Sequence, residues 1–304
     1  MYHYVRPFNE DFLYLKNLSF DNFKKQLDYF NEEFGFVKKD VFVDGFNGKT
    51  LPKGVVLTFD DGLSCHYDFV FKELKKRGLW GIFYIPTQPY TQGQLIDVHR
   101  IHVLLSKHNP KKLYDFLINI LEDSFIEKDK INEFKNKTYT RQKNDEYTNF
   151  IKKTLNYYIS YQFRNSIINL LMGKFVPNEN EIFEKYYLTK NQILEMHESG
   201  MVIGSHTVNH PVMSKLNIQD QESEIKDSFE FLKSVTKNFD HKTFCYPYGG
   251  FHSFTNQTER ILEKEKCLYS FNVESRDIDI NDVRFRPQSL PRYDCNEFPF
   301  GKVS

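Results

Sequence analysis

The sequence has little of what marks a nucleic-acid-binding, disulfide-rich or membrane-spanning protein. Its 41 Lys and Arg residues balance 41 Asp and Glu residues, so it lacks the excess positive charge with which proteins displace counterions from nucleic acids. Its four cysteines form no CxxC pair, which argues against a zinc knuckle, a redox dithiol or a disulfide framework. No run approaches the roughly 18 apolar residues of a membrane span.

The first residues also lack the apolar stretch of a signal peptide. We therefore expect a cytoplasmic protein, and we leave open a peripheral association with a membrane. The sequence does not indicate an oligomeric state. What it has in excess is aromatic residues, 30 Phe and 19 Tyr against one Trp, which suit either packing or stacking against sugar rings.

Short apolar runs alternate with helical patterns in two parts of the chain. Residues 54–59 and 80–85 have the composition of strands buried on both faces, and the apolar spacing between them predicts a helix. A strand, a helix and a strand in succession favour parallel pairing. The same alternation resumes at Leu188, with helices predicted over 189–196 and 218–237 and strands over 201–205 and 243–246. We expect an α/β fold.

Residues 99–187 differ in character. They are rich in Lys, Asn, Glu and aromatic residues, poor in Gly and Pro, and their apolar residues recur at helical spacing. We therefore predict a helical insertion over 99–187 between two parts of one catalytic domain, 1–98 and 188–304. Because the insertion leaves the second predicted strand at its carboxyl end, we expect it to lie over the mouth of that domain.

Unusual residues follow three of the predicted strands: Asp60-Asp61-Gly62, then His206 and His210, then the segment 247–250. Sites of parallel α/β proteins form at the carboxyl ends of strands. Histidines four apart can share a metal, although an isolated pair is more often solvent-facing. Adjacent aspartates are also common in turns and helix caps.

Taken together, a carboxylate and two imidazoles form a metal-ligand set with open positions. One aspartate would bind the cation, and the other would take a proton from a water that the cation activates. The residues thus indicate metal-assisted hydrolysis of a carbonyl compound.

Three ordered motifs carry a family resemblance: Thr58-Phe59-Asp60-Asp61-Gly62, His206-Thr207-Val208-Asn209-His210 and Tyr246-Pro247-Tyr248-Gly249. They resemble the motifs of the polysaccharide deacetylase family, also called the NodB homology domain. The resemblance covers residues 1–98 and 188–292. It implies a distorted (β/α) barrel, here with a mainly helical insertion, that removes an N-linked or O-linked acyl group, usually acetyl, from an amino sugar.

The resemblance also implies roles for individual residues. Asp61, His206 and His210 would hold one divalent metal, most commonly zinc, with cobalt, nickel or manganese as alternatives. Asp60 would be the general base, and the backbone N–H of Tyr248 would stabilise the oxyanion. We expect the substrate to contact Tyr246, Pro247, Gly249 and Arg292.

The sequence departs from the family pattern at two places. The position of an arginine that orients the base in many members is Cys245, and the terminal Leu-x-x-His motif is absent. We expect Arg292 to replace the arginine, the alternative being a surface ion pair. For the general acid we choose His99 over His102 and His3.

Three functional hypotheses follow. The first is a metal-dependent deacetylase acting on an acetylated amino sugar in a glycan or glycan precursor. The second is a non-catalytic carbohydrate-binding protein on the same fold, motivated by Cys245 and the missing histidine. The third is a deformylase or deacylase of a lipid-linked or nucleotide-linked sugar, motivated by the lack of an export signal.

Overall fold

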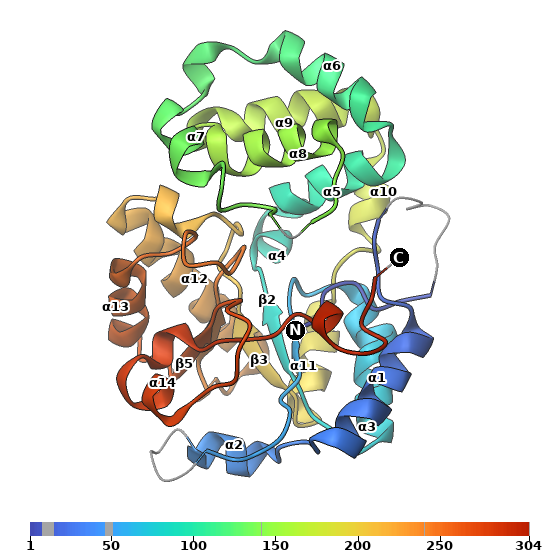
Figure 1. Ribbon diagram of the computed structural model, residues 1–304, viewed down its shortest axis with the longest axis vertical. Helices are drawn as coiled ribbons and strands as arrows, with labels where there is room; N and C mark the ends of the chain where they lie inside the picture. Colours follow the sequence, from blue (N-terminus) through green and yellow to red (C-terminus); the bar gives the residue numbers. More distant parts are fainter. Residues whose placement is uncertain (8–14, 46–50, 141, 240, 304) are drawn as a thin grey trace. The chain divides into compact units, whose positions relative to one another are not determined.

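Five parallel strands form the centre of the fold. The computed structural model describes residues 1–7, 15–45, 51–140, 142–239 and 241–303. Within them the sheet runs in the order β1-β2-β3-β4-β5 and curls into an incomplete barrel (Figure 1). The strands are β1 (Thr58–Phe59), β2 (Ile82–Ile85), β3 (Val202–Ser205), β4 (Thr243–Cys245) and β5 (Tyr269–Phe271). Four of them lie in predicted segments, and the α/β barrel expectation is confirmed.

The strands are buried on both faces, as their apolar composition predicts. In β2, Phe83 packs into the layer between sheet and outer helices. Its neighbours Ile82 and Tyr84 belong to a second apolar cluster, because successive side chains of a strand point to opposite faces. Phe59 stacks on Phe83 with ring centroids 4.7 Å apart, which fixes β1 against β2.

Single residues extend the sheet at both of its edges. Tyr2 pairs in parallel with Phe59, and Leu290 pairs in parallel with Phe271. Residues that follow Tyr2 and Leu290 therefore reach the same end of the barrel as the residues that follow β1 and β5. This places the beginning of the chain and a segment near residue 292 at the carboxyl ends of the strands.

One compact unit comprises Met1–Phe8, Lys16–Gln92 and Lys185–Ser304. Its helices surround the sheet in Figure 1: α1 (Phe20–Glu33), α2 (Lys39–Gly45), α3 (Lys72–Lys76), α4 (Gln88–Gln92), α11 (Lys190–Glu198), α12 (Ile218–Thr236), α13 (Asn256–Lys264) and α14 (Ile280–Phe285). A π-helical stretch, His66–Phe71, precedes α3. Ser19 caps α1 and Thr189 caps α11, because their hydroxyls accept orphan backbone N–H groups.

The second unit comprises Asn9–Leu15 and Gly93–Glu184. It contains α5 (Asp97–Lys107), α6 (Pro110–Ile120), α7 (Lys128–Phe134), α8 (Glu146–Lys153), α9 (Tyr161–Phe175) and α10 (Glu179–Phe183). Its helical character agrees with the prediction. Inside it, the buried guanidinium of Arg100 contacts Glu179 at 2.9 Å and Asn169 at 2.7 Å. The predicted position of the insertion over the barrel mouth stays a prediction.

No helix among the described residues combines the length and apolarity needed to cross a membrane.

Candidate active site

The predicted site residues collect at the carboxyl ends of neighbouring strands. Asp60 and Asp61 directly follow β1 and are 2% and 3% exposed. His206 directly follows β3, and the loop of Pro247 and Tyr248 begins two residues after β4. Left-handed backbone conformations, with positive φ, recur in these loops at Asp61, Thr207, His210 and Tyr248. Such strained conformations of non-glycine residues cluster at functional sites.

Asp61, His206 and His210 direct their ligand atoms at one point. Asp61 Oδ1 is 3.5 Å from His206 Nε2 and 3.5 Å from His210 Nε2. The three ligand atoms lie within 4.8 Å of one another. A carboxylate oxygen with two imidazole nitrogens is a donor set that suits zinc and related divalent cations.

The backbone fixes the orientation of His206. Its Nδ1 lies 2.7 Å from the carbonyl oxygen of Cys245, and since a carbonyl only accepts, Nδ1 carries the hydrogen. Nε2 is then the atom that faces Asp61. Burial alone lowers the pKa of His206, but the Cys245 side chain, the hydrogen bond to Asp61 and the charge of Asp60 outweigh burial and raise that pKa above its usual value.

Arg292 holds the other aspartate with both of its terminal nitrogens. Its Nη1 and Nη2 each lie 2.9 Å from an oxygen of Asp60. Nη1 also donates to Thr58 Oγ1 at 3.0 Å, and Nε donates to the Asn272 carbonyl at 3.0 Å. Burial alone would raise the pKa of Asp60, but the charge and hydrogen bonds of Arg292 hold it well below the usual range.

This arrangement brings together two residues that lie 232 positions apart. Arg292 is 6% exposed, so the alternative of a surface ion pair does not describe it. Its expected contact with substrate stays a prediction.

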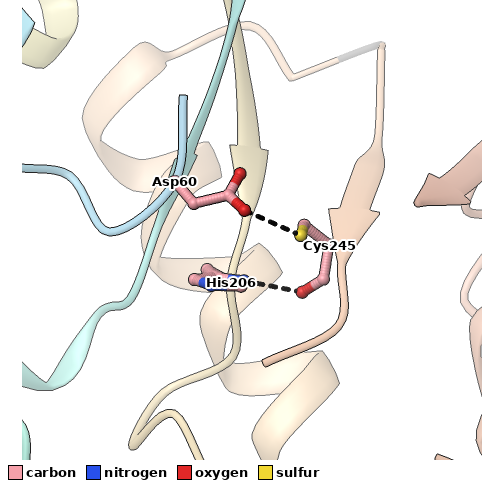
Figure 2. Close-up of side chains that lie close together, drawn as sticks. All are labelled: Asp60, His206 and Cys245. Atoms are coloured by element: carbon pink, nitrogen blue, oxygen red, sulfur yellow. Dashed lines mark hydrogen bonds between the residues drawn. The ribbon is translucent and has the colours of Figure 1, made fainter. Parts of the chain in front are cut away.

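Cys245 contacts both Asp60 and His206. Figure 2 shows its thiol beside Asp60 and its carbonyl beside His206. Its Sγ is 3.5 Å from Asp60 Oδ2 and 2.9 Å from Arg292 Nη2. Asp60, His206 and Cys245 form a second group with metal-ligand atoms, but the guanidinium of Arg292 already supplies its positive charge. The geometry therefore favours Asp61, with the two histidines, for a cation.

The loop after β4 is shaped by packing. Gly249 has φ +65°, and a Cβ there would lie 2.4 Å from Val273 Cγ1, so only glycine fits. The ring of Tyr248 lies 5.0 Å from that of His210. Tyr246 was expected to bind substrate, but its ring is 1% exposed and stacks on Phe254 at 3.8 Å. Its side chain therefore packs in the core and leaves no ring face for a sugar.

A further histidine, His3, lies beside Asp60. Its Nε2 lies 4.0 Å from Asp60 Oδ2, and its side chain is 40% exposed. His66 Nε2 donates to the His3 carbonyl at 2.8 Å, and burial lowers the pKa of His66 to about 4, so His66 holds this segment as a neutral donor. His99 lies buried in α5 of the helical unit, beside His102, and its role as acid stays a prediction.

The parallel half-barrel belongs to the class of NodB-type α/β barrels, and Asp60, Asp61 and His206 directly follow its strands. Residues 144–265 match the sequence model of the family described as Polysaccharide deacetylase. This match confirms the resemblance found in the motifs, and it includes the segments 206–210 and 246–249.

Individual relatives are similar over different lengths. YxkH of Bacillus subtilis (strain 168), which its name assigns to this family, is 35% identical over 95 residues, 30% of this chain and 31% of that protein. The Streptococcus pyogenes deacetylase PplD, solved in complex with acetate, has a TM-score of 0.59 at 18% identity over 96% of this chain and 89% of its own. IcaB from Ammonifex degensii has a TM-score of 0.55 at 18% identity over 96% and 88%. Both structures show the same fold.

Proposed function

We propose that the protein is a metal-dependent hydrolase that removes an acetyl group from an amino sugar of a glycan or glycan precursor. The observation that carries the proposal is the pairing of a cation-ligand set with a neighbouring base. Asp61, His206 and His210 converge on one point, and the adjacent Asp60 is held ionised by Arg292. A merely sugar-binding protein has no need for a buried, ion-paired carboxylate beside such a set.

Asp61, His206 and His210 would hold the cation, and zinc suits their nitrogen and oxygen donors best, with cobalt, nickel and manganese as alternatives. A bound cation would polarise the acyl carbonyl and lower the pKa of water. The remaining steps belong to side chains and backbone of this chain.

Asp60 would take the proton of the attacking water. Arg292 binds one lone pair on each of its oxygens, and a carboxylate has about four lone-pair sites, so proton acceptance stays available. The pKa of Asp60 lies well below its usual range, which keeps it ionised at neutral pH. Its contribution rests on a fixed orientation toward the water, since geometry precedes pKa for a general base.

We assign the general acid to His3, with His99 as the alternative. His3 is next to Asp60 and partly exposed, so it can reach both the reacting atoms and solvent. The leaving amine requires a proton when the carbon–nitrogen bond breaks. A protonated imidazole can donate that proton.

The backbone N–H of Tyr248 would stabilise the oxyanion. The left-handed conformation of Tyr248 and its contact with the His210 ring bring this part of the loop beside the cation ligands. Pro247 and Gly249 would line the substrate position on the same loop. The balanced charge of the chain suits an uncharged glycan.

The test is release of acetate by the wild-type chain, with zinc added, and by the variants Asp60→Asn and Asp68→Asn. Asp68→Asn is the control, because Asp68 is exposed. The substrates are acetylated amino-sugar polymers, oligosaccharides, and lipid-linked and nucleotide-linked sugars, with formylated analogues assayed for formate.

We expect Asp60→Asn to lose about 10²–10⁴-fold in rate while it retains bound zinc, and we expect the control to keep its rate. Full activity in Asp60→Asn would refute the mechanism. Sugar binding without metal and without turnover on any substrate would favour the non-catalytic alternative. Release of formate alone would favour the deformylase.

A further inference from the structure

The two histidine ligands lie on a turn that has no helical hydrogen bonds to set their spacing. Four residues apart on a helix, they would share a face through the helix's own geometry. Here Thr207 and His210 have φ values of 69° and 55°, and the segment from His206 to His210 belongs to neither helix nor strand. Groups outside the turn must therefore fix it.

We propose that Glu224 of α12 is the positioning residue that sets the spacing of His206 and His210, and with it the affinity of the chain for its divalent cation. This inference rests on the proposed function only in taking these histidines as cation ligands. Glu224 is not itself a ligand, because its carboxylate binds the opposite, backbone side of the turn.

The Glu224 carboxylate accepts hydrogen bonds from three donors of the turn. Oε2 accepts from the backbone N–H groups of Val208 and Asn209, both at 2.8 Å. Oε1 accepts from the side-chain amide of Asn209. Glu224 is 8% exposed, so water does not readily replace these bonds. Hydrogen bonds to a buried carboxylate are the strong kind.

Contacts from other elements complete the turn. The backbone N–H groups of Thr87 and Gln88 donate to the carbonyls of Thr207 and Val208 at 3.1 and 2.9 Å. The hydroxyl of Thr207 accepts from the His210 N–H at 2.9 Å. Backbone N–H groups of another segment thus hold two carbonyls of the turn. The carboxylate of Glu224 holds the N–H groups of Val208 and Asn209.

The register of α12 places Glu224 there. One helical turn further along, the Ser228 hydroxyl is 2.6 Å from the Ser205 hydroxyl. Ser205 Oγ in turn accepts from the Thr207 N–H at 3.1 Å. Glu224 and Ser228 therefore lie on the same face of α12 and lock that face to the end of β3 and to the turn.

The experiment measures the dissociation constant of Zn²⁺ for the purified full chain, by competition with a chelating dye, and checks folding by circular dichroism. Three variants change the carboxylate in different ways: Glu224→Ala, Glu224→Gln and Glu224→Asp. The matched control is Glu230→Ala, because Glu230 lies on the same helix with a side chain 66% exposed.

We expect Glu224→Ala to weaken zinc binding about 10- to 100-fold, as for other residues that orient metal ligands. Glu224→Asp keeps the charge but withdraws its oxygens from the turn, so it should also weaken binding. Glu224→Gln should lose less zinc affinity than Glu224→Ala, because the side-chain amide of Asn209 can rotate to present its oxygen to the NH₂ group of the new glutamine. Glu230→Ala should bind like the wild type.

Wild-type affinity in Glu224→Ala overturns the proposal. Wild-type affinity in Glu224→Asp, with Glu224→Gln as weak as Glu224→Ala, also overturns it, because charge alone would then explain the effect. If Glu224→Ala does not fold, the zinc affinities of Glu224→Gln and Glu224→Asp decide whether the proposal holds. The two proposals can fail separately. If the wild type binds zinc and the Glu224 variants show the expected order of zinc affinities, but the wild type releases no acetate, the proposed function is refuted and this inference stands.

Discussion

Replacing Arg292 with methionine should remove the counterion of Asp60 while leaving an apolar side chain of similar reach. In the wild type both groups are buried, with side chains 4% and 3% exposed. Breaking a buried ion pair by removing one partner costs about 3–5 kcal/mol, because the remaining charge is buried without compensation. We expect a loss of unfolding free energy of that size at pH 7.

The loss should depend on pH with a definite sign. In the wild type the pKa of Asp60 is held below its unfolded value, so its ionisation stabilises the fold above a pH of about 4 and this stabilisation is lost as pH falls through the folded pKa. Without Arg292, burial dominates and raises the pKa of Asp60 above its unfolded value. The folded variant then loses stability as pH rises above about 4. The difference in unfolding free energy between the wild type and the variant should therefore grow from pH 4 to pH 7.

The assay is urea unfolding of the wild type and the variant at pH 4 and pH 7. Arg286→Met is the control, because the Arg286 side chain is 46% exposed in its ion pair with Glu259, and an exposed pair contributes at most about 1 kcal/mol. Two results would show that the ion pair does not hold Asp60 ionised. One is a loss of unfolding free energy in Arg292→Met no larger than in the control, and the other is a loss of equal size at both pH values.

Three further outcomes follow from the same geometry. Removal of metal with a chelator should abolish acetate release, and added zinc should restore it. His210→Ala should not bind zinc, and added zinc should not restore its acetate release. Metal retained in that variant, measured by elemental analysis, would contradict the ligand set. His3→Gln should lower kcat about 10²–10⁴-fold with little change in KM, and an unchanged kcat in steady-state assays would count against His3 as the acid. Gly249→Ala should destabilise the fold by about 1–3 kcal/mol. Adding Val273→Ala to the same chain should restore part of this stability, measured by thermal unfolding. If it restores none, backbone strain alone is responsible.

Much of the barrel could be predicted from the sequence because its strands are short, fully buried and end in polar clusters. The segments of β1 to β4 are almost continuously apolar, and Thr189 signals the start of α11 by its capping hydroxyl. The metal-ligand motif was visible because its spacing is local. The observed strands are shorter than predicted: β1 is only Thr58–Phe59, and Val55 pairs instead with Phe36.

The rest depends on contacts between distant segments. β5 is only Tyr269–Phe271, and none of the three motifs follows it to mark it as a strand end. Tyr2 joins the sheet through a single bridge, so nothing local indicates that His3 reaches Asp60. Glu224 lies on an amphipathic helix, and periodicity shows that it is near the buried face but not which groups it binds.

The 232-residue separation of Asp60 and Arg292 also constrains the order in which this protein can fold. The Gly93–Glu184 part of the helical unit lies between them in the chain, so the loop that their contact closes contains all of that part. Closing a loop costs entropy that grows with its length. During synthesis, β1 emerges long before the segment that neutralises the carboxylate at its end. The barrel mouth is thus among the last parts of the molecule to become complete, and a chain stopped before residue 292 would have the metal ligands without a charge-compensated base.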